Sequence, residues 1–212
     1  MPTITPQRQT APPTSPSVAT DFLETLATIS AVVNVMKRDG SSLSLAAGLA
    51  EGIVSMERCA RAGRKLIFIG NGGSAGIASH QAVDYWKNGG LEAIAFNDAS
   101  LLTCIGNDFG YEQVFAQPIR RFAKAGDLLI AISSSGKSPN ILQGVAAACA
   151  MGCEVLTLSG FGSENPLRRL GALNFYVPSQ AYGIVEVTHL SLLHAMLDDL
   201  IARKARQAEG AR

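Results

Sequence analysis

The chain has 212 residues, enough for one well-buried domain and few for two, with 18 basic and 17 acidic side chains and a formal net charge of +1. Because this near-neutral sequence shows no basic stripe interleaved with aromatic residues, it argues against a nucleic-acid partner and favours a small anionic ligand. The sequence shows no apolar run of about 18 residues and no signal-peptide core, which predicts a cytoplasmic protein without membrane contact. It also has no Cys-x-x-Cys pair, which favours reduced thiols.

The sequence predicts one folded domain over residues 19–206 between two tails. Residues 1–18 hold five prolines among polar residues. Their apolar surface is too small to offset the entropy lost on ordering, so this segment is predicted to be disordered. A flexible C-terminal tail is predicted over residues 207–212.

Two helices are expected to lead the domain. Apolar residues recur at helical spacing from Asp21 to Met36, and Asp39-Gly40 is predicted to end that helix. Ser41 or Ser42 can cap a second helix, which is expected to run to Gly63.

Five apolar runs are too dense for strands with one solvated face and are typical of buried parallel strands. They lie at Leu66–Ile69, Ala93–Phe96, Leu128–Ile132, Val155–Leu158 and Leu173–Val177. Helical stretches separate or follow them, at about 74–87, 112–124, 139–151 and 182–205. This alternation predicts an α/β fold with a five-stranded, doubly wound parallel sheet and helices on both of its faces.

Two loops rich in glycine and serine follow directly after two of these strands. Gly70-Asn71-Gly72-Gly73-Ser74 follows the first apolar run, and Ser133-Ser134-Ser135-Gly136-Lys137-Ser138 follows the third. Small residues at a strand-to-helix junction let backbone N–H groups, hydroxyls and the helix N-terminus converge on a phosphate. Because ligands bind at the carboxyl ends of strands in such sheets, we expect one phosphorylated ligand between the two loops.

Three other interpretations of the loops remain open. Gly70-x-Gly72-x-x-Ala75 matches the dinucleotide fingerprint, although Glu92 opens the second strand where the acidic residue should close it. Gly136-Lys137-Ser138 ends like a P-loop, although the leading glycine of that motif is missing. Both loops could also be structural turns rich in small residues.

Three separated motifs carry a family resemblance: Gly70–Ser74, Asn97-Asp98 with Gly106-Asn107-Asp108-Phe109-Gly110, and Ile132–Ser138. In this order they resemble the SIS (sugar isomerase) domain, specifically its sedoheptulose-7-phosphate isomerase group, over about residues 20–202. The resemblance implies a three-layer, flavodoxin-like SIS fold and a homotetramer with sites at subunit interfaces. It also implies aldose–ketose isomerisation of a sugar phosphate.

The resemblance further implies which residues bind the substrate. Four serines of the second loop would hold the phosphate, namely Ser133, Ser134, Ser135 and Ser138. The sugar would lie against residues of the first loop and beyond it, namely Asn71, Gly72, Gly73, Ser74, Asp98 and Glu186. Hydroxyls and backbone N–H groups can bind a dianion without an arginine.

Two predicted helices carry all three histidines of the chain. His80 and Asp84 are four residues apart on one helix face, a spacing that suits a shared metal or substrate. The last helix carries Glu186, His189 and His194. Several members of the family bind zinc through a His and a Glu on the first of these helices and a Gln and a His on the last. The resemblance therefore implies a Zn²⁺ site made of His80, Asp84, Glu186 and His194.

This chain departs from the family's pattern around that site. Asp84 stands where the family has Glu, Glu186 where it has Gln, and Gly183 and Asn88 where it has an acidic residue and an Arg. Glu186 and His194 are also eight residues apart, about 12 Å along a straight helix. His189, three residues from Glu186, is the alternative ligand on local geometry.

Isomerisation needs a base beside the substrate carbonyl and an acid for the enediolate, and the resemblance gives these roles to Asp84 and His194. The predicted function is conversion of sedoheptulose 7-phosphate to D-glycero-D-manno-heptose 7-phosphate by acid/base proton transfer, with zinc polarising the carbonyl. The alternative is a non-catalytic SIS module that binds sugar phosphates as a regulator or as a scaffold of the initiator-associating type. The substitutions motivate the alternative, and the retained His194 favours the enzyme.

Overall fold

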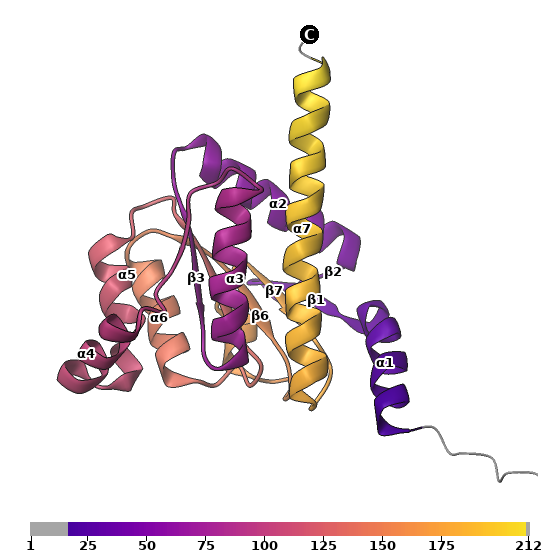
Figure 1. Ribbon diagram of the computed structural model, residues 1–212, viewed down its shortest axis with the longest axis horizontal. Helices are drawn as coiled ribbons and strands as arrows, with labels where there is room; N and C mark the ends of the chain where they lie inside the picture. The colour runs from indigo at the N-terminus through magenta and orange to yellow at the C-terminus, as the bar shows by residue number, and fades with distance from the viewer. Residues whose placement is uncertain (1–16, 211–212) are drawn as a thin grey trace, which may run out of the picture.

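A seven-stranded sheet lies between two layers of helices in the computed structural model, which describes residues 17–210 (Figure 1). The strand order is β2-β1-β7-β6-β5-β3-β4. The strands are β1 (Asn34–Lys37), β2 (Ser42–Leu43), β3 (Leu66–Gly70), β4 (Ala93–Ala95), β5 (Leu128–Ser133), β6 (Glu154–Ser159) and β7 (Leu173–Tyr176).

Seven α-helices and three 3-10 turns connect these strands within the described part of the chain. The helices are α1 (Val18–Thr28), α2 (Leu45–Arg61), α3 (Gly73–Lys87), α4 (Ala99–Phe109), α5 (Ala116–Phe122), α6 (Pro139–Ala150) and α7 (Tyr182–Gly210). The 3-10 turns are η1 (Ile29–Val32), η2 (Tyr111–Gln113) and η3 (Pro166–Arg169).

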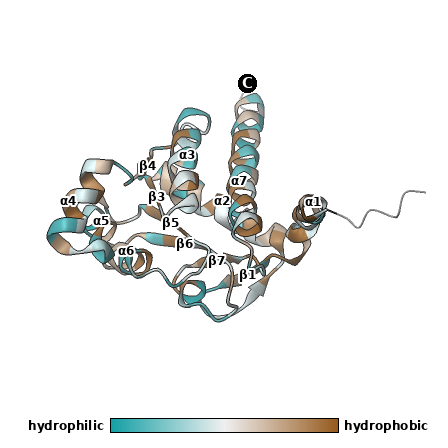
Figure 2. Cartoon of the chain, turned by 60° about the horizontal axis from the view of Figure 1, so that its bottom comes forward, coloured by the Kyte–Doolittle hydropathy of each residue, from teal (hydrophilic) through white to brown (hydrophobic). Residues whose placement is uncertain are grey.

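The alternation of side chains along β5 explains the three layers. Leu128, Ile130 and Ile132 join the apolar cluster formed with α2, α3 and α7. Leu129 and Ala131 point the other way, into the cluster formed with α5 and α6. Because both faces are covered, every residue of β5 is buried, as expected for a central parallel strand. Figure 2 shows the largely hydrophobic strands between these two sets of helices.

The five predicted strands are confirmed as a parallel set, β4-β3-β5-β6-β7. The prediction of a five-stranded sheet is corrected by two further strands. β1 and β2 form an antiparallel hairpin, and β1 pairs with β7 through registers such as Val35 with Phe175. The hairpin covers the backbone edge that β7 would otherwise expose.

The same hairpin corrects the predicted first helix, which ends at Thr28 and does not reach Met36. Val35 is almost fully buried, so the apolar residues counted as the end of a helix belong to β1. Asp39-Gly40 is the hairpin turn: Gly40 has φ +88°, and Ser41 donates to Asp39 Oδ1 from its backbone N (2.9 Å) and its hydroxyl (2.7 Å). The second helix accordingly begins later than predicted, at Leu45.

The segment between β4 and β5 also differs from its prediction. α4 was not expected, and the predicted helix at 112–124 is divided into η2 and the shorter α5. Asp98 starts α4 because its Oδ1 accepts a hydrogen bond from Leu101 N at 3.0 Å, which caps the helix.

The predicted tails fall mostly at the margins of the described residues. Disorder over 1–16 and flexibility over 211–212 lie outside them. Ser17 caps α1, and residues 207–210 continue α7, where a flexible tail was expected. Among the described helices, none has both the length and the hydrophobicity to cross a membrane.

Candidate active site

The direction of chain growth reverses between β3 and β5, which places a crevice at the carboxyl ends of these strands. From β3 the chain continues to β4 on one side of the sheet, whereas β5, β6 and β7 extend the sheet on the other side. β3 and β5 are parallel neighbours, with Gly70 opposite Ile132. Ligands of doubly wound sheets bind at such a reversal point, and both glycine- and serine-rich loops open there.

Glycine is required where the first loop turns into α3. A Cβ atom at Gly70 would overlap the backbone of Ser74, and Gly72 has φ +54°. This close return brings the N-terminus of α3 over the end of β3. The helix therefore directs its free N–H groups toward the crevice.

The second loop is a tight turn that presents serines to the same crevice. Gly136 has φ +62°, and its N–H donates to Ser133 O at 3.1 Å and to Ser133 Oγ at 3.1 Å. A Cβ at Gly136 would overlap the Asn165 side chain, so Asn165 packs directly against the turn. Ser138 then occupies the N-cap position of α6 without a capping hydrogen bond from its side chain, and Pro139 is the first residue of the helix.

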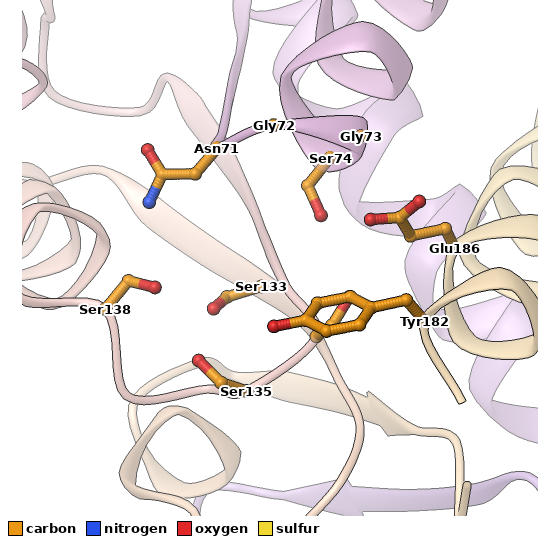
Figure 3. Close-up of a pocket in the computed structure, with 10 residues that line it drawn as sticks. Asn71, Gly72, Gly73, Ser74, Ser133, Ser135, Ser138, Tyr182 and Glu186 are labelled. Atoms are coloured by element: carbon orange, nitrogen blue, oxygen red, sulfur yellow. The ribbon is translucent and has the colours of Figure 1, made fainter. Parts of the chain in front are cut away.

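A pocket of about 230 Å³ lies between the loops (Figure 3). Its lining is polar and made of small side chains and backbone, apart from two residues of α7. The lining residues are Asn71, Gly72, Gly73, Ser74, Ser133, Ser134, Ser135, Ser138, Tyr182 and Glu186. Nine of these ten were predicted as substrate-binding residues, so the structure brings them together as expected.

Asp98 is the predicted substrate-binding residue that the structure places elsewhere. It is exposed, it is not part of the pocket lining, and its carboxylate caps α4. Its neighbour Asn97 donates to Ala75 O (2.9 Å) and Ser79 Oγ (2.8 Å), so this motif holds α3 in place. The structure therefore does not bring Asp98 to the pocket, because its side chain is directed toward the helix that it caps.

A reciprocal amide pair links the two loops. Asn71 Nδ2 donates to Asn140 Oδ1 at 2.9 Å, and Asn140 Nδ2 donates to Asn71 Oδ1 at 2.7 Å. Asn140 is buried in the first turn of α6. This pair fixes the spacing between the loops and so the width of the pocket. The sequence analysis did not include Asn140.

Glu186 faces the pocket and not the histidines. Its carboxylate lies against Gly73, where a Cβ atom would overlap it, at the N-terminus of α3. A helix N-terminus stabilises a carboxylate. Glu186 is therefore placed as predicted for substrate binding, but the structure does not bring it to His194 as a shared metal ligand.

A second cluster lies between α3 and α7, further along both helices. Asp84 Oδ2 is 3.2 Å from His80 Nε2 and 3.9 Å from His194 Nδ1, and one ligand atom of each residue lies within 4.8 Å of the others. The side chains of His80 and His194 are 54% and 38% exposed. Two imidazoles and a carboxylate at this spacing are a donor set that could hold a metal ion.

Gln81 orients His194 from the buried side of α3. Its Nε2 lies 3.0 Å from His194 Nε2, and its Oε1 is buried with no hydrogen-bond partner among the described residues. Reversing this amide would let Oε1 accept from a protonated Nε2, the tautomer that leaves His194 Nδ1 free as a ligand. Gln81 was missed from the sequence because nothing there shows that its side chain meets α7.

His189 is a structural residue. It is fully buried, and its Nε2 donates to Ser159 O at 3.1 Å. Burial lowers the pKa of His189 to about 4, against a smaller opposing effect of the Ser159 carbonyl. The structure therefore does not place the alternative metal ligand at either the pocket or the histidine cluster.

This buried histidine predicts a loss of stability in mild acid. Between pH 6.5 and pH 4 the unfolded chain binds a proton at residue 189 that the folded chain excludes, so stability is full above this range and falls as the pH drops through it. We expect the free energy of unfolding to fall by about 2 kcal/mol more in the wild type than in His189→Gln between pH 7 and pH 5. Urea titrations at several pH values measure this difference. The control Ser191→Ala, an exposed change on the same helix, removes no histidine and should keep the wild-type slope. Equal slopes for the wild type and His189→Gln would contradict the assignment.

Comparison with known proteins identifies the family of the chain. Residues 31–160 match the SIS domain family. The chain is 35% identical over 166 residues to the phosphoheptose isomerase of Dechloromonas aromatica, which covers 74% of this chain and 85% of that relative.

Solved structures agree with this relationship. The phosphoheptose isomerase GmhA from Neisseria gonorrhoeae superposes with a TM-score of 0.68 at 34% identity, over 74% of this chain and 87% of that one. A phosphoheptose isomerase from Francisella tularensis gives a TM-score of 0.70 at 30% identity, over 76% and 87%.

Proposed function

The chain belongs to the SIS domain family, and we propose that it is an aldose–ketose isomerase that converts sedoheptulose 7-phosphate to D-glycero-D-manno-heptose 7-phosphate. The observation that carries this proposal is the serine-lined pocket at the reversal point of the sheet. Within it, Ser134 Oγ is buried and has no hydrogen-bond partner in the described residues. An unpaired buried hydroxyl costs stability unless a ligand satisfies it.

The serine loop anchors the phosphate end of the substrate. Hydroxyls of Ser133, Ser134, Ser135 and Ser138 and the backbone N–H groups of the turn donate to the phosphoryl oxygens. Binding energy from this remote group orients the reacting end of the sugar. Glu186 accepts hydrogen bonds from sugar hydroxyls, since its carboxylate faces the same pocket.

Asp84 and His194 carry out the proton transfers. A proton leaves C1 of the ketose while the C2 carbonyl oxygen gains one, which gives an enediol. A proton then returns to C2 as the O1 hydroxyl loses its proton, which gives the aldose with no net gain or loss of atoms or electrons. A carboxylate beside an imidazole can serve as this base and acid pair.

We also propose that His80, Asp84 and His194 hold a zinc ion. In a tetrahedral zinc site, metal–ligand bonds of about 2.0–2.2 Å separate neighbouring ligand atoms by roughly 3.3 Å. The Asp84–His80 spacing of 3.2 Å fits this geometry, and the 3.9 Å to His194 needs a small adjustment. When bound, zinc would polarise the substrate carbonyl.

A homotetramer with sites at subunit interfaces, in the cytoplasm, completes the proposal. Glu186 and His194 are about 12 Å apart along α7, so within one chain the pocket and the histidine cluster do not form a single site. A site at a subunit interface would bring the pocket of one subunit to the histidine cluster of another. Val83 and Trp86 are exposed apolar residues of α3, the helix that carries His80, as expected for a surface that another subunit covers. All four cysteines are free, which suits a reducing compartment. A native mass measurement tests the assembly.

The direct test is turnover of sedoheptulose 7-phosphate. The wild-type protein, supplied with zinc, should form the aldose heptose phosphate, as followed by NMR or by a coupled assay. Thermal stabilisation by the sugar phosphate measures binding. Binding without any isomerisation would contradict the proposal that the chain is an enzyme and would favour a non-catalytic regulator or scaffold.

Removal of one ligand should separate zinc binding from folding. His80→Ala is expected to weaken zinc affinity at least tenfold, because one of three donors is lost, while thermal stability without metal stays within about 1 kcal/mol at this exposed position. Competition with a chromophoric chelator measures the affinity. Lys87→Ala, an exposed change on the same helix, serves as the matched control. Unchanged zinc affinity in His80→Ala would exclude this ligand set.

A further inference from the structure

Tyr182, the first residue of α7, contributes the one aromatic side chain to the pocket lining. The residue is 63% exposed, so packing in the core does not explain its position. Figure 3 shows its ring lying across the serine loop with the hydroxyl directed toward Ser133. The phenol therefore points to the place where the serines present their own hydroxyls.

Phe161 contacts the Tyr182 ring. The two rings meet edge to face, with centroids 4.7 Å apart and planes at 83°. This is a favourable aromatic geometry, and it restricts the rotation of an otherwise exposed side chain. We call Phe161 and Tyr182 the aromatic pair.

Phe161 adopts a backbone conformation that L-residues rarely take. Its φ is +56°, and it is the one non-glycine residue with positive φ in residues 17–210. Such a conformation persists only where neighbouring groups hold it, and it occurs often at ligand sites. A glycine would adopt this conformation without strain, so the backbone alone would favour glycine at this position over phenylalanine.

Three contacts hold this backbone in place. Tyr176 Oη donates to Phe161 O at 2.7 Å, and Phe161 N donates to Ser179 O at 3.0 Å. The Arg168 guanidinium lies 4.3 Å from the centre of the Tyr176 ring and stacks on it. The loop after β6 is thus fixed so that the aromatic pair faces the serine loop.

A second observation indicates that a ligand belongs beneath the Tyr182 ring. Ser134 lines the same pocket, is 95% buried by residue, and leaves its Oγ without a partner among the described residues. A terminal phosphate monoester supplies oxygens that can accept from Ser134 and from a phenol at the same time. The small pocket between the loops suits such a terminal group.

We propose that Tyr182 is a phosphate-binding residue, whose hydroxyl donates to a phosphoryl oxygen of the substrate, and that Phe161 is the positioning residue for its ring. This inference rests on the proposed function, because it concerns the same pocket. It adds an aromatic donor to the serine loop and makes the start of α7 part of substrate recognition.

Tyr182→Phe tests the hydroxyl alone. The variant loses one hydrogen bond to the charged phosphate. The dissociation constant of inorganic phosphate should therefore rise about tenfold or more, and KM for the sugar phosphate should rise similarly, with kcat nearly unchanged. Isothermal titration calorimetry and steady-state kinetics measure the two effects. Thr103→Val, which removes an exposed hydroxyl of α4 that does not line this pocket, is the control.

Phe161→Gly tests the positioning role without relying on a folding defect. Glycine relieves the strained φ but removes the contact of the Phe161 ring with the core, so the melting temperature should fall modestly. Phosphate binding should weaken in the folded protein because the Tyr182 ring is released. Phe161→Tyr keeps an aromatic ring and should restore the affinity.

The outcomes separate this inference from the proposed function. Weaker phosphate binding in Tyr182→Phe and Phe161→Gly supports the inference even if the wild type turns over no sugar. Wild-type phosphate affinity and KM in Tyr182→Phe overturn the inference and leave the isomerase proposal intact. Failure of the wild-type protein to bind phosphate at all overturns both.

Discussion

His194→Ala should lower kcat for sedoheptulose 7-phosphate by about 10²–10⁴-fold, the usual contribution of a positioned proton-transfer group. The imidazole lies beside Asp84 and is held by the buried amide of Gln81, which gives it a fixed position for proton transfer. The affinity for inorganic phosphate should not change, because the serine loop is a separate part of the site. Steady-state kinetics and calorimetry together measure this contrast.

Controls distinguish lost chemistry from lost structure. The His194 side chain is partly exposed, so its removal should leave the melting temperature close to that of the metal-free wild type. Ser191→Ala, an exposed change on the same helix, should keep full activity. A His194→Ala protein that turns over sugar at the wild-type rate would remove His194 from the mechanism.

The parts of the site that depend on local backbone chemistry could be predicted from the sequence. Gly70, Gly72 and Gly136 mark turns where a side chain would overlap its neighbours or where φ is positive. Their place directly after buried strands fixes them at one edge of the sheet. This is why the two loops, which supply eight of the ten residues lining the pocket, could be recognised, whereas Glu186 on α7 was predicted only from the family resemblance.

The parts that depend on how distant segments meet could not be predicted. Gln81, Asn140 and Tyr182 act through partners 113, 69 and 21 residues away along the chain, and no local pattern encodes those contacts. Asp98 looked like a sugar ligand in its motif, but a helix begins at that residue and uses its carboxylate as a cap.

The edge hairpin was missed for a related reason. The apolar residues up to Met36 continue the helical spacing of α1, so periodicity alone extends the helix. Pairing with β7 overrides it because the segment gains a full set of backbone hydrogen bonds and buries Val35. Because β1 pairs with a strand about 140 residues later in the chain, its formation depends on tertiary structure and not on local sequence.

Asp127→Ala should destabilise the fold by about 3–5 kcal/mol, the range for removing one partner of a buried ion pair. Asp127 is almost fully buried between α5 and β5, and its carboxylate accepts from Lys65 N (3.0 Å), Lys65 Nζ (2.7 Å) and Lys124 N (2.8 Å). The substitution leaves the ammonium of Lys65, whose side chain is only 16% exposed, without its counter-charge. It also leaves two backbone N–H groups without acceptors. Urea unfolding at pH 7 measures the loss.

The position of Asp127 connects this loss to the site. Lys65 precedes β3 and Asp127 precedes β5, so the carboxylate joins the first ends of the two strands whose other ends carry the phosphate loops. Lys65→Met in the Asp127→Ala background should recover part of the stability, because it removes the unpaired charge. Asp199→Ala, which breaks a more exposed pair with Arg203, should cost less than about 1 kcal/mol. An Asp127→Ala protein as stable as Asp199→Ala would show that the pairing of β3 with β5 does not depend on this carboxylate.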